Sequence, residues 1–370
     1  MKNLHKIFAL FLSFSVLSTI LMPVARATST LDSVPVLVQN KISEWNNSNE
    51  LAQVKYLTDF AGNSYTLAEC TPSGYLIYNN QTSIIVENAP NSLSPYQGRT
   101  SGLYYAGPTK YYYYDLSAHE YKHTILDEVL SADTVIYQRE ICCQMQLALK
   151  QQKTELLQKA NSPGLTTTAD VYKYVGNHKS FFTNLTTANK MGYYCPANSD
   201  GVCGYVASGL VLLYFDYYHN GNFIDNGTYL ASSGSAFKNG NFTKFLYENI
   251  GKSELNYTDD AINATQAAKV MQKYLSVSQN ISVSYWSATM PTASDVVNQI
   301  DKGRPVIYTD RWYTPQSNSG DTVDHSIVIY GYNYSTNDLV AHFGWEGYAE
   351  VMCSSPVLAT FISTASTLAV

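Results

Sequence analysis

Charged residues are scarce in this chain of 370 residues: Lys, Arg, Asp and Glu make up 14% of it, against roughly 25% in a typical soluble domain. Basic residues are the rarer kind, with 23 against 29 acidic ones, and the net charge at pH 7 is −6. Nucleic-acid binding needs a basic face to neutralise phosphates, so we expect no nucleic acid as partner. The hydrophobic fraction of 45% excludes a disordered chain, because enough apolar surface exists to offset chain entropy.

Long apolar runs are absent beyond the N-terminal segment, so no later stretch is suited to span a bilayer as a helix. The one long run, residues 7–24, follows Lys2 and Lys6 and precedes the small residues of the Ala-Arg-Ala sequence at 25–27. This order is typical of a secretory signal peptide. An uncleaved membrane anchor is the alternative, since the run is long for a signal. We expect residues 1–27 to be a signal peptide and the protein to be secreted or on the cell surface.

Cysteine is sparse, and its layout is poor for a disulfide framework. The six cysteines are Cys70, Cys142, Cys143, Cys195, Cys203 and Cys353. The sequence holds no C-x-x-C pair and no histidine cluster at metal-ligand spacing, so we expect neither a metal nor a cofactor. If one cysteine is a free nucleophile, five remain, and they can form two bridges at most.

Tyrosine is abundant instead, with 32 copies, and the chain divides near residue 165. Short alternating runs separated by turn residues between residues 54 and 88 indicate an antiparallel meander. Residues 124–160 carry apolar positions at helical spacing. The sequence NSPGLTTT at 161–168 has the composition of a linker. We therefore predict two domains after the signal peptide, residues 28–165 and 166–370.

Cys203 is predicted to stand at the start of a buried helix. Apolar residues recur at helical spacing from Val206 to Tyr217, and Ser199 and Asp200 are candidate N-caps. At a helix start the free backbone N–H groups and the helix dipole stabilise a thiolate, which lowers the cysteine pKa from its usual value of about 8.5. A buried structural cysteine is the alternative interpretation.

Two histidines lie in a predicted hairpin near the C-terminus. His325 heads an apolar strand that ends at Tyr332, and His342 lies near the end of the next strand. If the strands pair through residues 333–337, His325 and His342 can face one another. A thiolate–imidazole pair needs a third polar group to hold the ring, and the second histidine can supply it. For His325 alone, a structural strand histidine is the alternative.

Four motifs in this order resemble the papain-like cysteine peptidases, specifically the streptopain-like and bacteriocin-leader-peptidase-like bacterial branches. The motifs are GVCGYVA at 201–207, GRPVI at 303–307, DHSIVIYGY at 324–332 and HFGWEG at 342–347. In that family the cysteine opens a long central helix, and the histidine begins a barrel strand. The resemblance implies an α+β papain-like fold, with the central helix packed on an antiparallel sheet or barrel. It also implies that Cys203 is the nucleophile and His325 the general base.

Two positions depart from the family's pattern. The third catalytic residue of the family is usually Asn or Asp, and the matching residue here is His342, which we expect to orient His325. The family also places a Gln shortly before the cysteine as an oxyanion donor, but none occurs between Phe182 and Cys203. Asn198 is the nearest amide and is the provisional oxyanion donor. A loop-capping role for Asn198 is the alternative.

The meander before the catalytic motifs resembles, less specifically, the prodomain that keeps such enzymes latent. We therefore expect a secreted cysteine peptidase made as a zymogen and cut between about residues 158 and 185. Its expected partners are a protein or peptide substrate and its own N-terminal prodomain as inhibitor, and it is expected to be a monomer. The alternatives are a peptidoglycan peptidase or amidase, and a non-catalytic secreted binding module that keeps the fold. For the meander itself, the alternative is a permanently attached binding domain.

Overall fold

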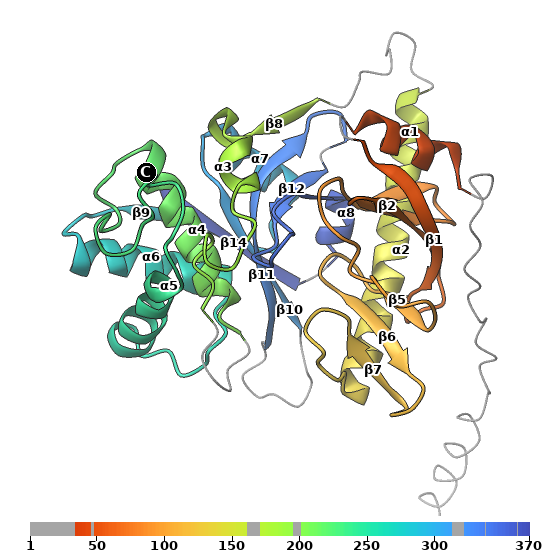
Figure 1. The fold of residues 1–370 in the computed structure, drawn as a ribbon, viewed down its shortest axis with the longest axis horizontal. Helices are drawn as coiled ribbons and strands as arrows, with labels where there is room; N and C mark the ends of the chain where they lie inside the picture. Colours follow the sequence, from red (N-terminus) through yellow and green to blue (C-terminus); the bar gives the residue numbers. More distant parts are fainter. Residues whose placement is uncertain are drawn as a thin grey trace, which may run out of the picture.

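The computed structural model describes residues 34–45, 48–160, 171–194, 201–312, 322–336, 338–360 and 362–370, and mixes helices with strands throughout (Figure 1). The N-terminal half, residues 34–160, contains α1 (Val36–Glu44), β1 (Glu50–Thr58), β2 (Ser64–Thr71), β3 (Tyr75–Asn79), β4 (Ile84–Ala89), β5 (Leu103–Tyr105), β6 (Tyr111–Asp115), β7 (Glu120–His123) and α2 (Ala132–Ala160). The C-terminal half, residues 171–370, contains β8 (Tyr172–Tyr174), η2 (Val175–Asn177), α3 (Lys179–Thr183), α4 (Cys203–Tyr218), α5 (Asn241–Phe245), η3 (Leu246–Glu254), α6 (Ala264–Ser278), β9 (Ser284–Thr289), α7 (Ala293–Asp301), β10 (Val306–Trp312), β11 (Thr322–Asn333), β12 (Leu339–His342), β13 (Val351–Cys353), α8 (Ser355–Leu358) and β14 (Ile362–Ala369). The predicted combination of helices and strands is confirmed.

Strands β1 to β4 form the antiparallel meander predicted from the alternating runs. Side chains alternate between the two faces of a strand, and in β3 both faces are covered. Leu76 and Tyr78 pack in a small core with Val38 of α1. Tyr75 and Ile77, on the opposite face, belong to the main core. Cover on both faces explains why all of β3 is buried.

Helix α2 begins later than its apolar pattern predicted, at Ala132 rather than at residue 124. The chain turns first: Asp127 adopts a left-handed φ of 57°, and Leu126 N–H donates to the Nδ1 of His123. Ser131 Oγ then accepts from the N–H of Thr134 at 3.1 Å, as an N-cap does. The helix prediction is wrong for residues 124–131, because the main chain there forms a turn whose N–H groups donate to the ring of His123.

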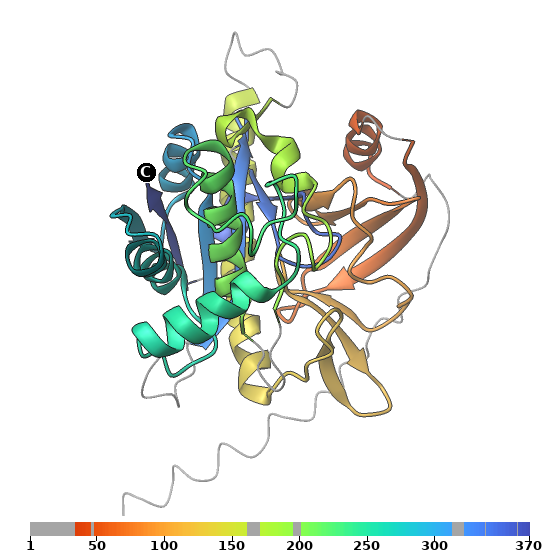
Figure 2. The ribbon, with the colours of Figure 1, turned by 60° about the vertical axis from the view of Figure 1, so that its left-hand side comes forward.

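The C-terminal half has a central helix on an antiparallel sheet. Strands β12, β11, β10, β14 and β9 pair in this order, all antiparallel. Helix α4 packs on β10 and β11, and its residues 204–216 are all buried. Figure 2 shows α4 and α2 on opposite sides of these strands. The predicted buried helix starting at Cys203 and the predicted hairpin of β11 and β12 are both confirmed.

The two halves share one sheet. Strand β4 pairs with β13, with Glu87 opposite Cys353 and Asn88 opposite Met352, so the meander continues into strands β13, β12 and β11. Helix α2 adds a contact in which Ser354 Oγ donates to Gln152 at 3.2 Å. The predicted linker, residues 161–168, lies outside the described residues. The described parts on either side of it contribute to the same hydrophobic core.

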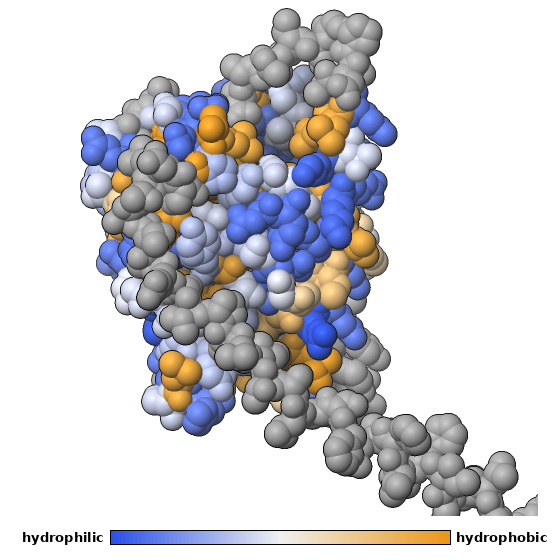
Figure 3. Space-filling view, turned by 90° about the vertical axis from the view of Figure 1, so that its right-hand side faces the viewer, coloured by the Kyte–Doolittle hydropathy of each residue, from blue (hydrophilic) through white to orange (hydrophobic). Residues whose placement is uncertain are grey.

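The surface of the N-terminal half is mixed. Figure 3 shows hydrophilic residues in the middle of this face and apolar residues in separate patches around it. No helix among the described residues is both long and apolar enough to cross a membrane.

Candidate active site

Cys203 is the first residue of α4 and is half-buried. Two glycines let this helix start pack closely on residues 261 and 262. A Cβ on Gly201, whose φ is +144°, would lie 2.9 Å from the Cβ of Ala261, and a Cβ on Gly204 would lie 2.5 Å from Cγ1 of Ile262. The first turn of α4 holds no acidic residue that would oppose a thiolate. The sequence around Cys203 therefore builds a tightly packed helix start.

Three of the other described cysteines, Cys70, Cys142 and Cys353, are poorer candidates for a nucleophile. Burial raises the pKa of the Cys142 and Cys353 thiols well above the usual value. Burial, with the Glu69 charge, raises the pKa of Cys70 to about 11. These three thiols hold little thiolate near neutral pH, and the thiolate is the reactive form. Cys195 lies outside the described residues.

His325 is buried on β11, and its ring is held by the main chain. Its Nε2 lies 2.6 Å from the carbonyl oxygen of Phe343, and its ring centroid lies 4.4 Å from that of Trp345. A carbonyl oxygen only accepts, so Nε2 carries the hydrogen and Nδ1 is the nitrogen that can accept a proton. This is the tautomer that a general base for a thiol requires.

The turn after β12 connects His325 to the start of α4. Phe343 supplies the carbonyl that holds His325, and a Cβ on the next residue, Gly344, would lie 3.8 Å from Cγ1 of Val206. Val206 is three residues after Cys203 on α4. Helix α4 also packs on β11, the strand of His325. The fold thus gathers the cysteine and histidine motifs around one Gly- and Trp-containing turn.

The structure corrects the prediction that His342 orients His325. His342 Nε2 donates to the carbonyl of Leu185 at 2.7 Å, and its Nδ1 accepts from the N–H of Gly344 at 2.9 Å. In the β11–β12 register it stands opposite Val328, not His325. Both ring nitrogens are thus bonded to the main chain. Burial lowers the His342 pKa to about 4, so the ring is neutral near pH 7.

His342 therefore anchors the chain around Leu185 to the turn that carries Phe343 and Trp345. The contact with His325 comes from the Phe343 carbonyl instead. A main-chain carbonyl leaves no side-chain signature in the sequence. The one sequence signal for this carbonyl is its position, since Phe343 lies two residues before Trp345, which packs on His325. Asn198, the provisional oxyanion donor, lies outside the described residues, as do Ser199 and Asp200.

We expect His342→Ala to damage stability more than catalysis. The substitution removes two buried hydrogen bonds and leaves a cavity, which together cost about 2–5 kcal/mol of unfolding free energy. Urea unfolding measures this loss, and active-site titration gives turnover per folded molecule, which should stay within about threefold of the wild type. If folded His342→Ala loses turnover as completely as His325→Ala does, His342 has a catalytic role after all.

The N-terminal half contacts this site through residues that the sequence analysis did not identify. The ring centroids of Tyr111 and His123 lie 6.5 Å and 5.9 Å from that of Trp345, on which His325 packs. Lys110 Nζ lies 2.9 Å from Oδ2 of Asp310, and both side chains are buried. The acidic and basic partners are 200 residues apart in sequence, so no local pattern predicts their pairing.

The same turn is held from its other end. Ser92 Oγ donates to the carbonyl of Gly347 at 2.7 Å, and the Asn91 amide donates to Glu350 at 3.2 Å. The N-terminal half therefore contacts the Gly/Trp turn at Trp345 and again after it, at Gly347.

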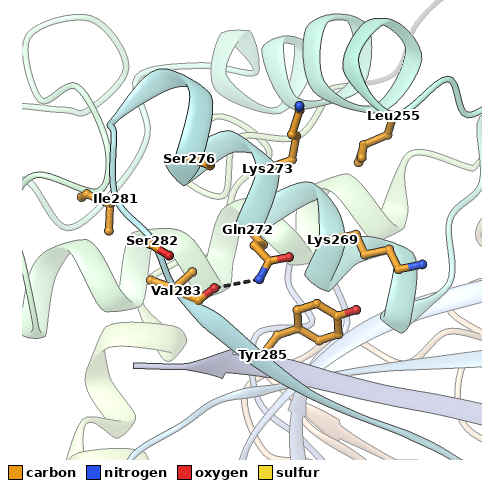
Figure 4. Close-up of a pocket in the computed structure, with 9 residues that line it drawn as sticks. All are labelled: Leu255, Lys269, Gln272, Lys273, Ser276, Ile281, Ser282, Val283 and Tyr285. Carbon is orange, nitrogen blue, oxygen red and sulfur yellow. Dashed lines mark hydrogen bonds between the residues drawn. The ribbon is translucent and has the colours of Figure 1, made fainter.

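A separate pocket of about 400 Å³ lies between α6 and β9, at the end of the sheet opposite the N-terminal strands (Figure 4). It is lined by Leu255, Lys269, Gln272, Lys273, Ser276, Ile281, Ser282, Val283 and Tyr285. Figure 4 shows the Gln272 amide directed at the carbonyl of Val283, to which it donates at 2.7 Å. None of the lining residues is Cys or His, so this pocket lacks the groups for thiol catalysis. Among the described residues, no group of three or more His, Cys, Asp or Glu is placed to hold a metal ion.

Residues 200–346, which include Cys203, His325 and His342, match the model of the Peptidase_C39 like family. This match covers less than half of the chain. No curated protein matches the sequence. Among solved structures, xylellain, a cysteine protease from Xylella fastidiosa, is similar at 12% identity over 56% of this chain and 94% of that chain, with a TM-score of 0.25. The family match supports a cysteine peptidase, and the branch named from the sequence stays a prediction.

Proposed function

We propose that this protein is a cysteine peptidase in which Cys203 is the nucleophile and His325 the general base. The observation that carries the proposal is the hydrogen bond from His325 Nε2 to the Phe343 carbonyl, which fixes the tautomer. Phe343 belongs to the turn that packs on the first turn of α4, where Cys203 stands. The match of residues 200–346 to a peptidase family supports the same assignment.

The chemistry follows from these positions. The Cys203 thiol gives its proton to His325 Nδ1, and the thiolate attacks the carbonyl carbon of a peptide bond. His325 then donates that proton to the leaving amine as the C–N bond breaks, which leaves an acyl-enzyme. Water, deprotonated by His325, attacks the thioester, and the acid product leaves as the thiol is restored. Main-chain N–H groups at the start of α4 stabilise the oxyanion, with Asn198 as the proposed side-chain donor.

In this proposal the Phe343 carbonyl replaces the side chain that normally orients the histidine. It accepts from Nε2–H and so stabilises the imidazolium that forms during the reaction. Trp345 packs on the same ring and keeps water from competing for the bond.

We further propose that the precursor is exported and latent. Residues 1–27 carry the signal-peptide pattern. Tyr111 and His123 pack on Trp345, next to His325, which supports an inhibitory N-terminal half. A cut between about residues 158 and 185 leaves the β4–β13 pairing intact, so activation also requires release of the N-terminal half from the sheet.

The test is intact-mass analysis of the secreted protein with and without a thiol-directed peptide epoxide, together with casein cleavage. We expect one adduct, mapped to Cys203, and casein hydrolysis that the adduct stops. N-terminal sequencing of active material should give a start between about residues 158 and 185. Clearing of cell-wall suspensions without casein cleavage would favour a peptidoglycan peptidase or amidase. Absence of both activities and of the adduct would favour a non-catalytic module.

A further inference from the structure

Lys110 is a buried lysine held in a tight turn of the N-terminal half. Its side chain is 2% exposed and forms the ion pair with Asp310 of the C-terminal half. The turn, residues 107–110, is closed by the N–H of Lys110 donating to Gly107 and by the Lys110 carbonyl accepting from Ala106. His123 Nε2 donates to the Thr109 carbonyl at 2.8 Å and holds the turn in place. The fold thus presents one ammonium group to the other half on a rigid support.

Asp310 lies beside the candidate catalytic histidine in the sheet. Strand β10 pairs with β11, and the register shifts between Thr309, opposite Ser326, and Arg311, opposite Val323. Asp310 therefore stands opposite residues 324 and 325 at a β-bulge, a feature common next to active sites. Its side chain is 7% exposed, so its carboxylate is taken out of water together with the Lys110 ammonium.

The turn also approaches His325 through Trp345. Tyr111 follows Lys110 directly, and its ring packs near Trp345, which in turn packs on His325. This segment places a lysine on the carboxylate opposite the strand position of His325 and a tyrosine on the ring that covers His325, so on the proposed function it stands next to the position of a bound peptide. When the N-terminal half leaves, Asp310 loses its cation. A buried carboxylate without a cation partner is costly, so the site favours a ligand that brings a new one.

We propose that Asp310 is a specificity-determining residue that binds a lysine or arginine side chain of the peptide substrate, and that Lys110 occupies this subsite in the precursor. This inference rests on the proposed function, and it adds a substrate class: peptides with a basic residue near the scissile bond. The same ion pair acts as a latch, because a substrate must displace Lys110 to bind.

The specificity is tested with the self-processed enzyme, its active sites counted with the peptide epoxide. The probes are peptides that differ only in having lysine, arginine, norleucine or glutamate at one position near the scissile bond, scanned over the positions on both sides. At one position we expect kcat/KM for lysine to exceed that for norleucine, its uncharged size match, by at least about 30-fold. Asp310→Asn should reduce this ratio of kcat/KM values to within about threefold. The kcat/KM for the norleucine peptide itself should change by less than about threefold. Asp216→Asn, a buried aspartate of α4, is the matched control and should keep the preference.

The latch is tested in the full-length precursor by the rate at which the epoxide modifies Cys203. Lys110→Met keeps the buried aliphatic chain and removes the charge, and it should raise this rate by about tenfold or more. Lys55→Met is the matched control: Lys55 is also a buried lysine paired with a carboxylate, Glu69, but both lie in the N-terminal half. It should leave the labelling rate near that of the wild type.

Three results would overturn the inference. One is the absence of any position that prefers a basic residue in an enzyme whose Cys203 is labelled. Another is an Asp310→Asn enzyme whose kcat/KM falls equally for all the peptides, which indicates a structural role. The third is a Lys110→Met precursor labelled no faster than the Lys55→Met control. Failure to label Cys203 in the processed protein would instead refute the peptidase itself, and the specificity proposal with it.

Discussion

Replacing Cys203 by alanine is expected to lower peptide hydrolysis by about 10⁴-fold or more, because no other group can form the acyl-enzyme. The change removes one sulfur at a half-buried helix start, so the fold should persist, and circular dichroism checks this. The variant precursor should also accumulate uncleaved if processing is self-catalysed. The measurements are turnover of casein and the mass of the protein recovered from culture supernatant.

The matched control is Cys143→Ala on α2, since Cys143 is the exposed cysteine among those described. It should keep wild-type turnover and processing. His325→Ala should match Cys203→Ala in turnover, because the thiol then lacks its base. The assignment is wrong if the Cys203→Ala protein still hydrolyses casein, or if iodoacetamide at about pH 6 labels Cys70, Cys142 or Cys353 before Cys203.

The parts of the site that the sequence predicted are those encoded in local side-chain patterns. The helix starting at Cys203 follows from apolar spacing, and the hairpin that carries His325 follows from two apolar runs around a polar turn. Each of these signals lies within about fifteen residues of the group that it positions.

The parts that sequence reasoning missed depend on the main chain or on distant pairings. The Phe343 carbonyl does what His342 was expected to do, and a carbonyl is present at every residue. The pairing of β4 with β13 and the Lys110–Asp310 ion pair each join segments more than 190 residues apart. The linker composition predicted two domains, and it gave no sign that strands of both halves join in one sheet and that both halves contribute to one core.

A buried glutamate at the junction of the halves is expected to make the stability of the precursor depend on pH. Glu87 of β4 is fully buried, and its carboxylate accepts from the hydroxyls of Tyr75 and Tyr111 at 2.6 Å and of Tyr105 at 3.1 Å. Burial raises its pKa from 4.5 to about 7, and the three hydroxyls offset only part of that rise. Tyr111 connects this cluster to Trp345 of the candidate active site.

The sign of the effect follows from proton counting. Between about pH 4.5 and 7 the folded protein holds a proton on Glu87 that the unfolded chain has lost, so this group's contribution to stability falls as pH rises. A shift from 4.5 to about 7 corresponds to about 3 kcal/mol of unfolding free energy. His342 acts in the opposite direction, since its lowered pKa makes stability rise with pH between about 4 and 6.5. The wild-type profile is therefore a sum of opposing terms, and only a difference between variants isolates Glu87.

We expect the free energy of unfolding of Glu87→Gln, measured relative to that of the wild type, to increase by about 3 kcal/mol from pH 4.5 to pH 8. The reason is that the amide has no proton to lose. Urea unfolding of both precursors at the two pH values measures this change, and any fixed cost of the substitution cancels in the comparison. A free-energy difference between the two proteins that is the same at both pH values would contradict the prediction. Because Glu87 lies where β4 meets β13 and contacts Tyr111, we expect its ionisation to weaken the contact between the two halves. On the proposed function, the wild-type precursor should therefore resist protease cleavage between its halves better at pH 5 than at pH 8, and Glu87→Gln should remove most of that difference.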